Sequence, residues 1–340
     1  MGERIMRLST SAQRRVRLPN DICIGAASVS GLLGCVMTKH AVVYASQKSK
    51  TKHQTDVRSV HVQFYRPIFP VKDPAVVLHL EEVNIGKAWS TFRVELTYGR
   101  DAKLAVSADI TLFNFQLPGE TLPTNWSLTP PTPNVDLAFQ SFNFPAYCPA
   151  LLTATDPDWA CYHPAFYPAG FARGMFYVRY FIPRRLPEEK AMWTNELIQF
   201  AIDLTLPVQE NLRSAEAASA PIGSLAATLA FAAKQKQLYD DGHNDWRQLQ
   251  NDGLLPHLDG DLWRTSMINA TLGMSVEIKK KLPEAGVRWL YLRGEITKVE
   301  SSRFDLEMLF LDKSRDLVAI GHQVAWIVAD VQKQRRDSSL

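Results

Sequence analysis

Cysteine is scarce in this chain, and the cysteines that are present stand far apart. The 340-residue sequence contains four of them, Cys23, Cys35, Cys148 and Cys161. They form neither a CxxC pair nor another zinc-ligand spacing, so a metal site is not expected. Scattered cysteines favour a reduced, intracellular protein, and we expect a cytoplasmic one. The sequence implies no metal and no organic cofactor.

The chain also lacks a strong net charge and a long apolar run. Its 38 basic and 35 acidic residues leave a net charge of +3, without the concentrated basic face that nucleic-acid binding needs. No run approaches the ~18 apolar residues of a membrane span. We therefore expect neither a nucleic-acid partner nor a membrane span. The final Ser-Ser-Leu partly matches the Ser-Lys-Leu peroxisomal signal, so a peroxisomal location is the alternative.

What the sequence does contain is a helix followed by strands, and it contains this pattern twice. Residues 26–45 are mostly apolar and predict a buried helix. From Ser59 onward, apolar and polar residues alternate in several segments separated by turn residues, which is typical of an antiparallel sheet. A second helix is predicted at 224–239, and alternating strands return from residue 272.

The two sets of strands match at a nearly constant offset. Val62 matches Val276 and Leu104 matches Leu317, at offsets of 214 and 213 residues. Such a spacing indicates a duplicated unit. The expected fold class is α+β, with one long antiparallel sheet built from two halves that each wrap one helix. Joining the halves edge to edge would remove exposed edge strands.

The expected domain organisation follows from these repeats and from the segment between them. Residues 117–170 are rich in proline and aromatic residues, which predicts an ordered linker. The remaining expected parts are a mobile tail (1–18), a first repeat (19–116), a second repeat (171–330) and a C-terminal tail (331–340).

A resemblance to a known fold rests on the strands of both repeats. It is carried by LGMSVEIKKKLPEAGVRWLYLRGEITKVESSRFDLEMLFLDKSRDLVAIGHQVAWIV, by SVHVQFYRP and by VDL at 135–137. These segments resemble the double hotdog proteins of the acyl-CoA thioesterase II group, and most closely its fungal thioesterase-like branch. The resemblance covers about residues 19–330. It implies a double hotdog fold, two tandem helix-plus-sheet repeats, and a small acyl substrate.

The resemblance also implies a hydrolytic site, in which an Asp, a Thr or Ser and a Gln hold a water against the thioester carbonyl. Gln323, in the strand LVAIGHQVAWIV, matches the Gln position, and Thr297 matches the Thr position. The Asp position falls near Gly273, but no Asp or Glu occurs between Asn269 and Val276. The expected general base is absent there, and Ser275 is the candidate to stand in for it.

Two residues of the first repeat are further candidates. His61 aligns by offset with Ser275, and a His at the junction of two hotdog halves can act as acid or base. Asp109 interrupts an apolar strand near the position that corresponds to Gln323, and a carboxylate there needs a partner or a function. Both also fit a solvated strand face. Because neighbouring strand residues point to opposite faces, only one of His322 and Gln323 is expected to face a cavity.

The leading functional hypothesis is an acyl thioester hydrolase with an atypical active site that lacks the expected Asp. A second departure is Ala26-Ala27-Ser28, where the family often has a Gly-Gly-aromatic stretch. Two alternatives therefore stay open. One is a non-hydrolytic tailoring enzyme, a cyclase, dehydratase or isomerase, that acts on a polyketide-like intermediate in fungal secondary metabolism. The other is a non-catalytic acyl-binding protein. The resemblance also suggests association into homo-oligomers.

Overall fold

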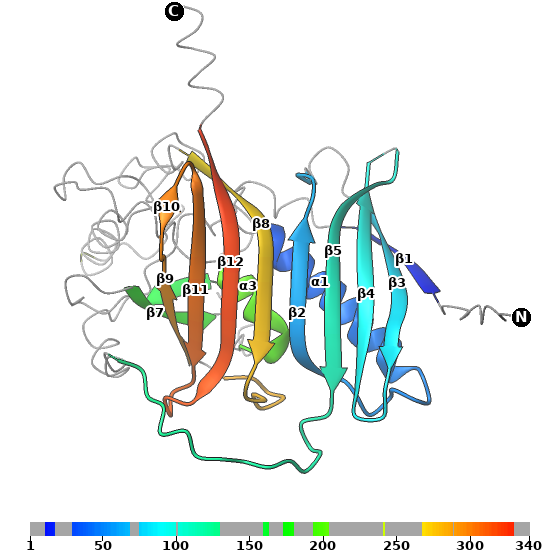
Figure 1. Cartoon of the computed structure of the whole chain (residues 1–340), viewed down its shortest axis with the longest axis horizontal. Coiled ribbons are helices and arrows are strands. Elements are labelled where there is room, and N and C mark those ends of the chain that lie inside the picture. The colour runs from blue at the N-terminus through cyan, green and yellow to red at the C-terminus, as the bar shows by residue number, and fades with distance from the viewer. Residues whose placement is uncertain are drawn as a thin grey trace, which may run out of the picture.

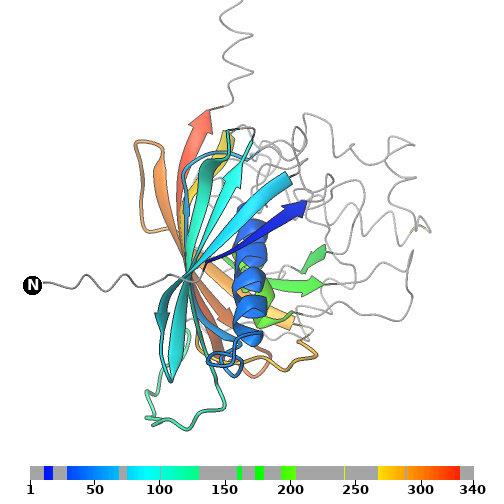
Figure 2. The ribbon, with the colours of Figure 1, turned by 90° about the vertical axis from the view of Figure 1, so that its right-hand side faces the viewer.

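The strands that the structure describes form one antiparallel sheet, and the described helices lie on one face of it (Figures 1 and 2). The computed structural model describes residues 11–17, 29–68, 75–99, 101–129, 159–162, 173–179, 193–203, 241, 267–287 and 289–329. The strand order within these ranges is β1-β3-β4-β5-β2-β8-β12-β11-β9-β7-β6, and β10 pairs with β11. The expected α+β class is confirmed.

The strands of each half lie together in the sheet. On the first side are β1 (Ser11–Arg17), β2 (Asp56–Phe64), β3 (Ala75–Ile85), β4 (Trp89–Tyr98) and β5 (Lys103–Phe113). On the second side are β6 (Trp159–Tyr162), β7 (Arg173–Arg179), β8 (Met267–Ile278), β9 (Trp289–Glu295), β10 (Val299–Glu300), β11 (Arg303–Leu311) and β12 (Leu317–Ala329). Apolar and polar residues alternate along most of these strands, which is why the sequence predicts them well.

The two halves meet where β2 pairs with β8. Val60 lies opposite Val276 and His61 lies opposite Ser275 in this antiparallel pair. The expectation that the halves join edge to edge is therefore confirmed. The junction turns two potential edge strands into central ones, where their backbone hydrogen bonds are satisfied.

The helix predicted at 26–45 is present as α1 (Val29–Ser46), which packs along one face of the first half (Figure 2). Leu33, Met37 and Ala41 recur at four-residue spacing and are buried. They face a layer of apolar strand residues, of which Phe92, Val94 and Ile110 are fully buried. This layer is the hydrophobic core of the first half.

The second half is covered by a short 3-10 turn, η2 (Asn195–Leu197), that leads into α3 (Ile198–Asp203). Ile198, Ala201 and Ile202 of α3 are buried against the sheet and α1. The sequence analysis does not predict this helix. The helix that it predicts at 224–239 lies outside the described residues.

Two glycines allow α3 to approach its neighbours closely. A methyl group on Gly31 would lie 2.6 Å from the carbonyl oxygen of Gln199 and 2.9 Å from the Cα of Phe200, so α1 and α3 touch at backbone level. A methyl group on Gly321 of β12 would lie 2.7 Å from the Cδ1 of Ile202. Gly321 thus makes room for α3 on the inner face of β12.

Two described segments fall in parts of the chain expected to be a tail and a linker. Residues Ser11–Arg17 form β1 and pair with β3, and Trp159–Tyr162 form β6 and pair with β7. The domain boundaries themselves stay a prediction. Among the described helices, none is long and apolar enough to cross a membrane.

Candidate active site

Gln323 lies on the inner face of β12, the face that the helices cover. It is 7% exposed, whereas the neighbouring His322 is on the outer face of the sheet and partly exposed. The Gln323 Nε2 donates a hydrogen bond of 2.8 Å to the hydroxyl of Thr271 and lies 3.5 Å from Oδ1 of Asp203. Gln323 therefore joins β12 to a hydroxyl on β8 and a carboxylate on α3.

Asp203 ends the described part of α3, and its carboxylate faces the start of α1. It is 6% exposed. Oδ2 accepts the backbone N–H of Gly31 at 2.9 Å, and the backbone N–H and hydroxyl of Ser30 also hydrogen-bond to this carboxylate. The first N–H groups of a helix have no partner within the helix, so α1 offers them to Asp203. The positive end of the α1 dipole favours an anion at the same place.

The Asp203 carboxyl titrates near neutrality. Burial raises its pKa from 3.8 to about 7, because removal from water penalises the charged form. The hydrogen bonds from Gly31, Ser30 and Gln323 act in the opposite direction and offset part of this increase. A carboxylate with such a pKa is both present in its basic form and basic enough to take a proton at neutral pH.

Thr271 reaches the inner face because β8 contains a bulge. Gly273 pairs with Val324 and Thr271 pairs with Ala325, so Leu272 is an extra residue without a partner on β12. The bulge reverses the alternation of side chains along β8. The carbonyl oxygen of Leu272 accepts a hydrogen bond of 2.8 Å from the Gln63 side chain.

The structure does not bring Thr297 or Ser275 to Gln323. Thr297 is exposed in the turn between β9 and β10. Ser275 is on the outer face of β8, because it pairs directly with His322 and His61. The hydroxyl beside Gln323 is instead that of Thr271.

A carboxylate lies beside Gln323, and it is on α3 and not near Gly273, where the sequence analysis looks for one. Asp203 stands beside Gln323 although it is 120 residues away in sequence. This carboxylate comes from a helix and not from the strand that carries Thr271. The expectation of an active site that lacks the family's Asp stays a prediction.

His61 and Asp109 lie side by side on the outer face, as a cross-strand pair of β2 and β5. Asp109 accepts two hydrogen bonds from Arg93, at 2.8 and 2.9 Å, and both side chains are more than 40% exposed. An exposed pair of this kind contributes at most about 1 kcal/mol to stability. Both residues are separated from Gln323 by the thickness of the sheet.

A hollow of about 180 Å³ also lies on the outer face, over β9, β11 and β12. Its lining includes His322, Glu307 and Arg293, but not Gln323. The hollow and the buried polar cluster of Asp203, Thr271 and Gln323 therefore lie on opposite faces of the sheet.

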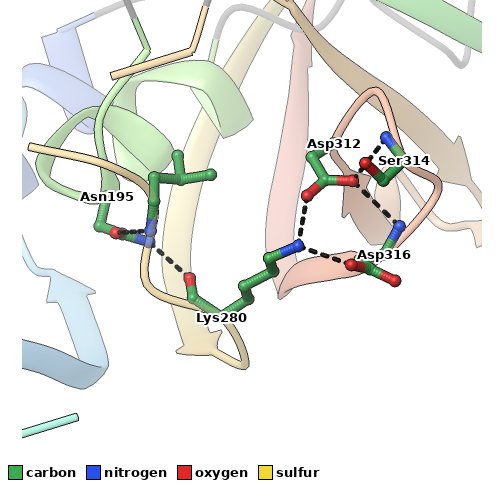
Figure 3. Close-up of polar contacts among 6 residues, drawn as sticks. Asn195, Lys280, Asp312, Ser314 and Asp316 are labelled. Atoms are coloured by element: carbon green, nitrogen blue, oxygen red, sulfur yellow. Dashed lines mark hydrogen bonds and ion pairs between the residues drawn. The ribbon is translucent and has the colours of Figure 1, made fainter. Parts of the chain in front are cut away.

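A polar network fixes the start of the segment that carries Asp203 (Figure 3). The Asn195 side chain accepts the backbone N–H of Leu282 at 2.7 Å and donates to the carbonyl of Lys280 at 3.0 Å. The Lys280 ammonium contacts both Asp312 and Asp316 at 2.6 Å, in the turn between β11 and β12. The network ties η2 to two turns of the sheet, so α3 starts from a fixed position.

No group of three or more potential metal ligands occurs among the described residues. Asp203, Gln323, Thr271 and Ser30 together supply one carboxylate, one amide and two hydroxyls, and none of them is an imidazole or thiolate that prefers zinc. Its chemistry is that of proton transfer and hydrogen bonding.

The chain has the double hotdog fold, with two helix-plus-sheet halves that share one sheet. A family model described as the acyl-CoA thioesterase C-terminal domain matches residues 129–327, more than half of the chain. The chain therefore belongs to this acyl-CoA thioesterase family.

One curated relative and two solved structures are similar to this chain over most of its length. It is 26% identical over 347 residues to the thioesterase-like protein TwmA of Talaromyces wortmannii, with 93% of this chain and 88% of that protein covered. The acyl-CoA thioesterase II TesB2 from Mycobacterium marinum has a TM-score of 0.51 at 12% identity, with 94% of both chains covered. A putative thioesterase from Novosphingobium aromaticivorans has a TM-score of 0.55 at 16% identity, with 93% of this chain and 95% of that chain covered. These structural similarities show the fold.

Proposed function

We propose that the protein hydrolyses acyl thioesters, such as acyl-CoA, at Asp203, Thr271 and Gln323. The observation that carries this proposal is the buried carboxylate of Asp203, held beside Gln323 at the start of α1. The family match and the name of the fungal relative support the same class of substrate. The site then has the carboxylate, hydroxyl and amide that the resemblance implies.

The reaction needs one base and two orienting groups. Ionised Asp203 takes a proton from a water, and the resulting hydroxide adds to the thioester carbon. Gln323 and Thr271 fix the positions of the water and the carbonyl oxygen by hydrogen bonds. The C–S bond then breaks, and the leaving thiolate takes the proton back from Asp203. The products are a carboxylic acid and a free thiol, and Asp203 is ionised again.

Replacing Gln323 with alanine should lower kcat for thiol release by about 10²–10³-fold, the loss typical of a removed orienting or oxyanion donor. The measurement is free-thiol release from short, medium and long acyl-CoAs. Asp109→Ala is the matched control, because Asp109 lies on the outer face and should leave kcat unchanged. Equal losses in both variants would contradict the proposed site. Absence of thiol release with every acyl-CoA would instead favour tailoring chemistry or acyl binding.

The pH dependence of hydrolysis should report Asp203. Because only the ionised carboxylate acts as a base, kcat/KM should fall about tenfold per pH unit below the pKa of about 7 and be constant above it. The measurement is a kcat/KM profile between pH 5 and pH 9 at constant ionic strength. A profile that is already flat at pH 5 would mean that another group, with an ordinary carboxyl pKa, is the base.

A further inference from the structure

We propose that Ser30 is a positioning residue that relays the proton state of Asp203 to Thr271, and so decides when the Thr271 hydroxyl can donate a hydrogen bond to the reacting oxygen. This inference rests on the proposed function and deepens it. Ser30 is the second residue of α1.

Ser30 is the side chain that connects the carboxylate with the threonine. Its Oγ donates to the Thr271 Oγ1 at 3.2 Å, and it also hydrogen-bonds to the Asp203 carboxylate. The Thr271 Oγ1 accepts a second hydrogen bond from Gln323 at 2.8 Å. A hydroxyl oxygen has two lone pairs, so both are used, and the single Thr271 proton is left to be donated. Among the described residues, no acceptor takes it.

The serine has one proton, so its two contacts depend on each other. When Asp203 is ionised, the charged oxygen is the stronger acceptor, and the Ser30 proton points to it. Ser30 then offers a lone pair to Thr271, whose proton is used within the protein. When Asp203 is protonated, it can donate to Ser30, Ser30 donates to Thr271, and the Thr271 proton is free for the substrate.

This exchange matches the order of events in hydrolysis. Before attack, Asp203 is ionised and the thioester carbonyl is neutral. As the water proton moves to Asp203 and the hydroxide adds to the carbonyl carbon, the carbonyl oxygen becomes negative. Rotation of the Ser30 and Thr271 hydroxyls then directs a donor toward this oxyanion at the moment that the charge develops. No bond other than those of the hydrolysis itself forms or breaks.

Ser30→Thr and Ser30→Val form a matched pair, since the two side chains have the same shape and only threonine has a hydroxyl. We expect Ser30→Thr to keep kcat within about threefold of wild type. Ser30→Val should lower kcat about tenfold or more at unchanged KM, because a donor used only in the transition state is lost. The midpoint of its pH profile should move to higher pH, since a hydrogen bond to ionised Asp203 is removed. Equal kcat and equal midpoints in the two variants would overturn the inference.

A double-mutant cycle tests whether Ser30 acts through Thr271. In a Thr271→Val background, Ser30→Val should cost little additional kcat, because the relay already lacks its last member. If the two losses multiply in full, Ser30 does not act through Thr271 and the relay is wrong.

A readout without turnover separates this inference from the proposed function. Protein labelled with 13C at the Asp carboxyl carbons is titrated by NMR, and the Asp203 signal is assigned by its absence in Asp203→Asn. Thr271→Val should shift the Asp203 midpoint when Ser30 is present, and should not shift it in Ser30→Val. Lack of thiol release in wild type would refute the proposed function, whereas identical midpoints in all variants would refute the relay.

Discussion

Asp203→Asn should lower kcat for thioester hydrolysis by about 10³-fold, within the range that removal of a general base gives. Asparagine has nearly the same shape, but its amide cannot take a proton from water. The residual activity should no longer depend on pH between 5 and 9, because the titrating group is gone. The measurement is the kcat/KM profile of the variant beside that of wild type. A variant with wild-type kcat would exclude Asp203 as the base.

Thermal or urea unfolding checks that this variant is folded. The difference in unfolding free energy between wild type and Asp203→Asn should also depend on pH. The Asp203 pKa is higher in the folded protein, about 7, than the ordinary value of 3.8. Between these two values the folded protein holds more of the proton, so the stability of wild type relative to Asp203→Asn should fall as pH rises from about 4 to about 7. Outside this window the difference should be constant. A difference that grows in wild type's favour with pH would mean that the carboxylate is stabilised, not penalised, by its surroundings.

Gly31→Ala should destabilise the protein by about 1–3 kcal/mol and abolish most of its activity, because the added methyl group meets backbone atoms of α3. These atoms, the Gln199 carbonyl oxygen and the Phe200 Cα, cannot move without displacing α3. Displacement also lengthens the hydrogen bond from the Gly31 N–H to Asp203. The measurements are the free energy of unfolding and the rate of thiol release.

Gly119→Ala provides the control for this substitution, since a methyl group there has no heavy atom within 4 Å. It should change neither stability nor activity. If Gly31→Ala behaves in the same way, then the close approach of α1 and α3 is not what holds Asp203 in place.

The fold could be predicted because its signals are periodic and repeated. Alternation marks the strands, and the offset that aligns Val62 with Val276 reveals the duplication. The helix at residues 26–45 was long enough for its apolar character to show. The described part of α3 has six residues, too few for a helical period to be recognised.

The candidate site could be predicted only where strand alternation holds. Gln323 is in the part of β12 that follows the irregularity at Val318, where side chains alternate regularly. The opposition of Gln323 and His322 follows from this period of two. Alternation alone does not predict that Thr271 faces inward, because the bulge at Leu272 shifts the alternation by one residue. Asp203 could not be placed either, since its contact with Gln323 depends on how a short helix packs across the sheet. Two close approaches at Gly31 and Gly321 decide that packing, and neither has a sequence signal of its own.

The two halves, which meet where β2 pairs with β8, contribute different residues to the polar cluster. By the repeat offset of 213, the inward position that corresponds to Gln323 is Ile110, which is fully buried hydrocarbon. The first half instead supplies the start of α1, with Ser30 and Gly31, while the second half supplies Asp203, Thr271 and Gln323. The polar cluster of Ser30, Asp203, Thr271 and Gln323 is thus built from both halves. Neither half therefore holds the complete cluster by itself, so the site depends on the pairing of the two halves.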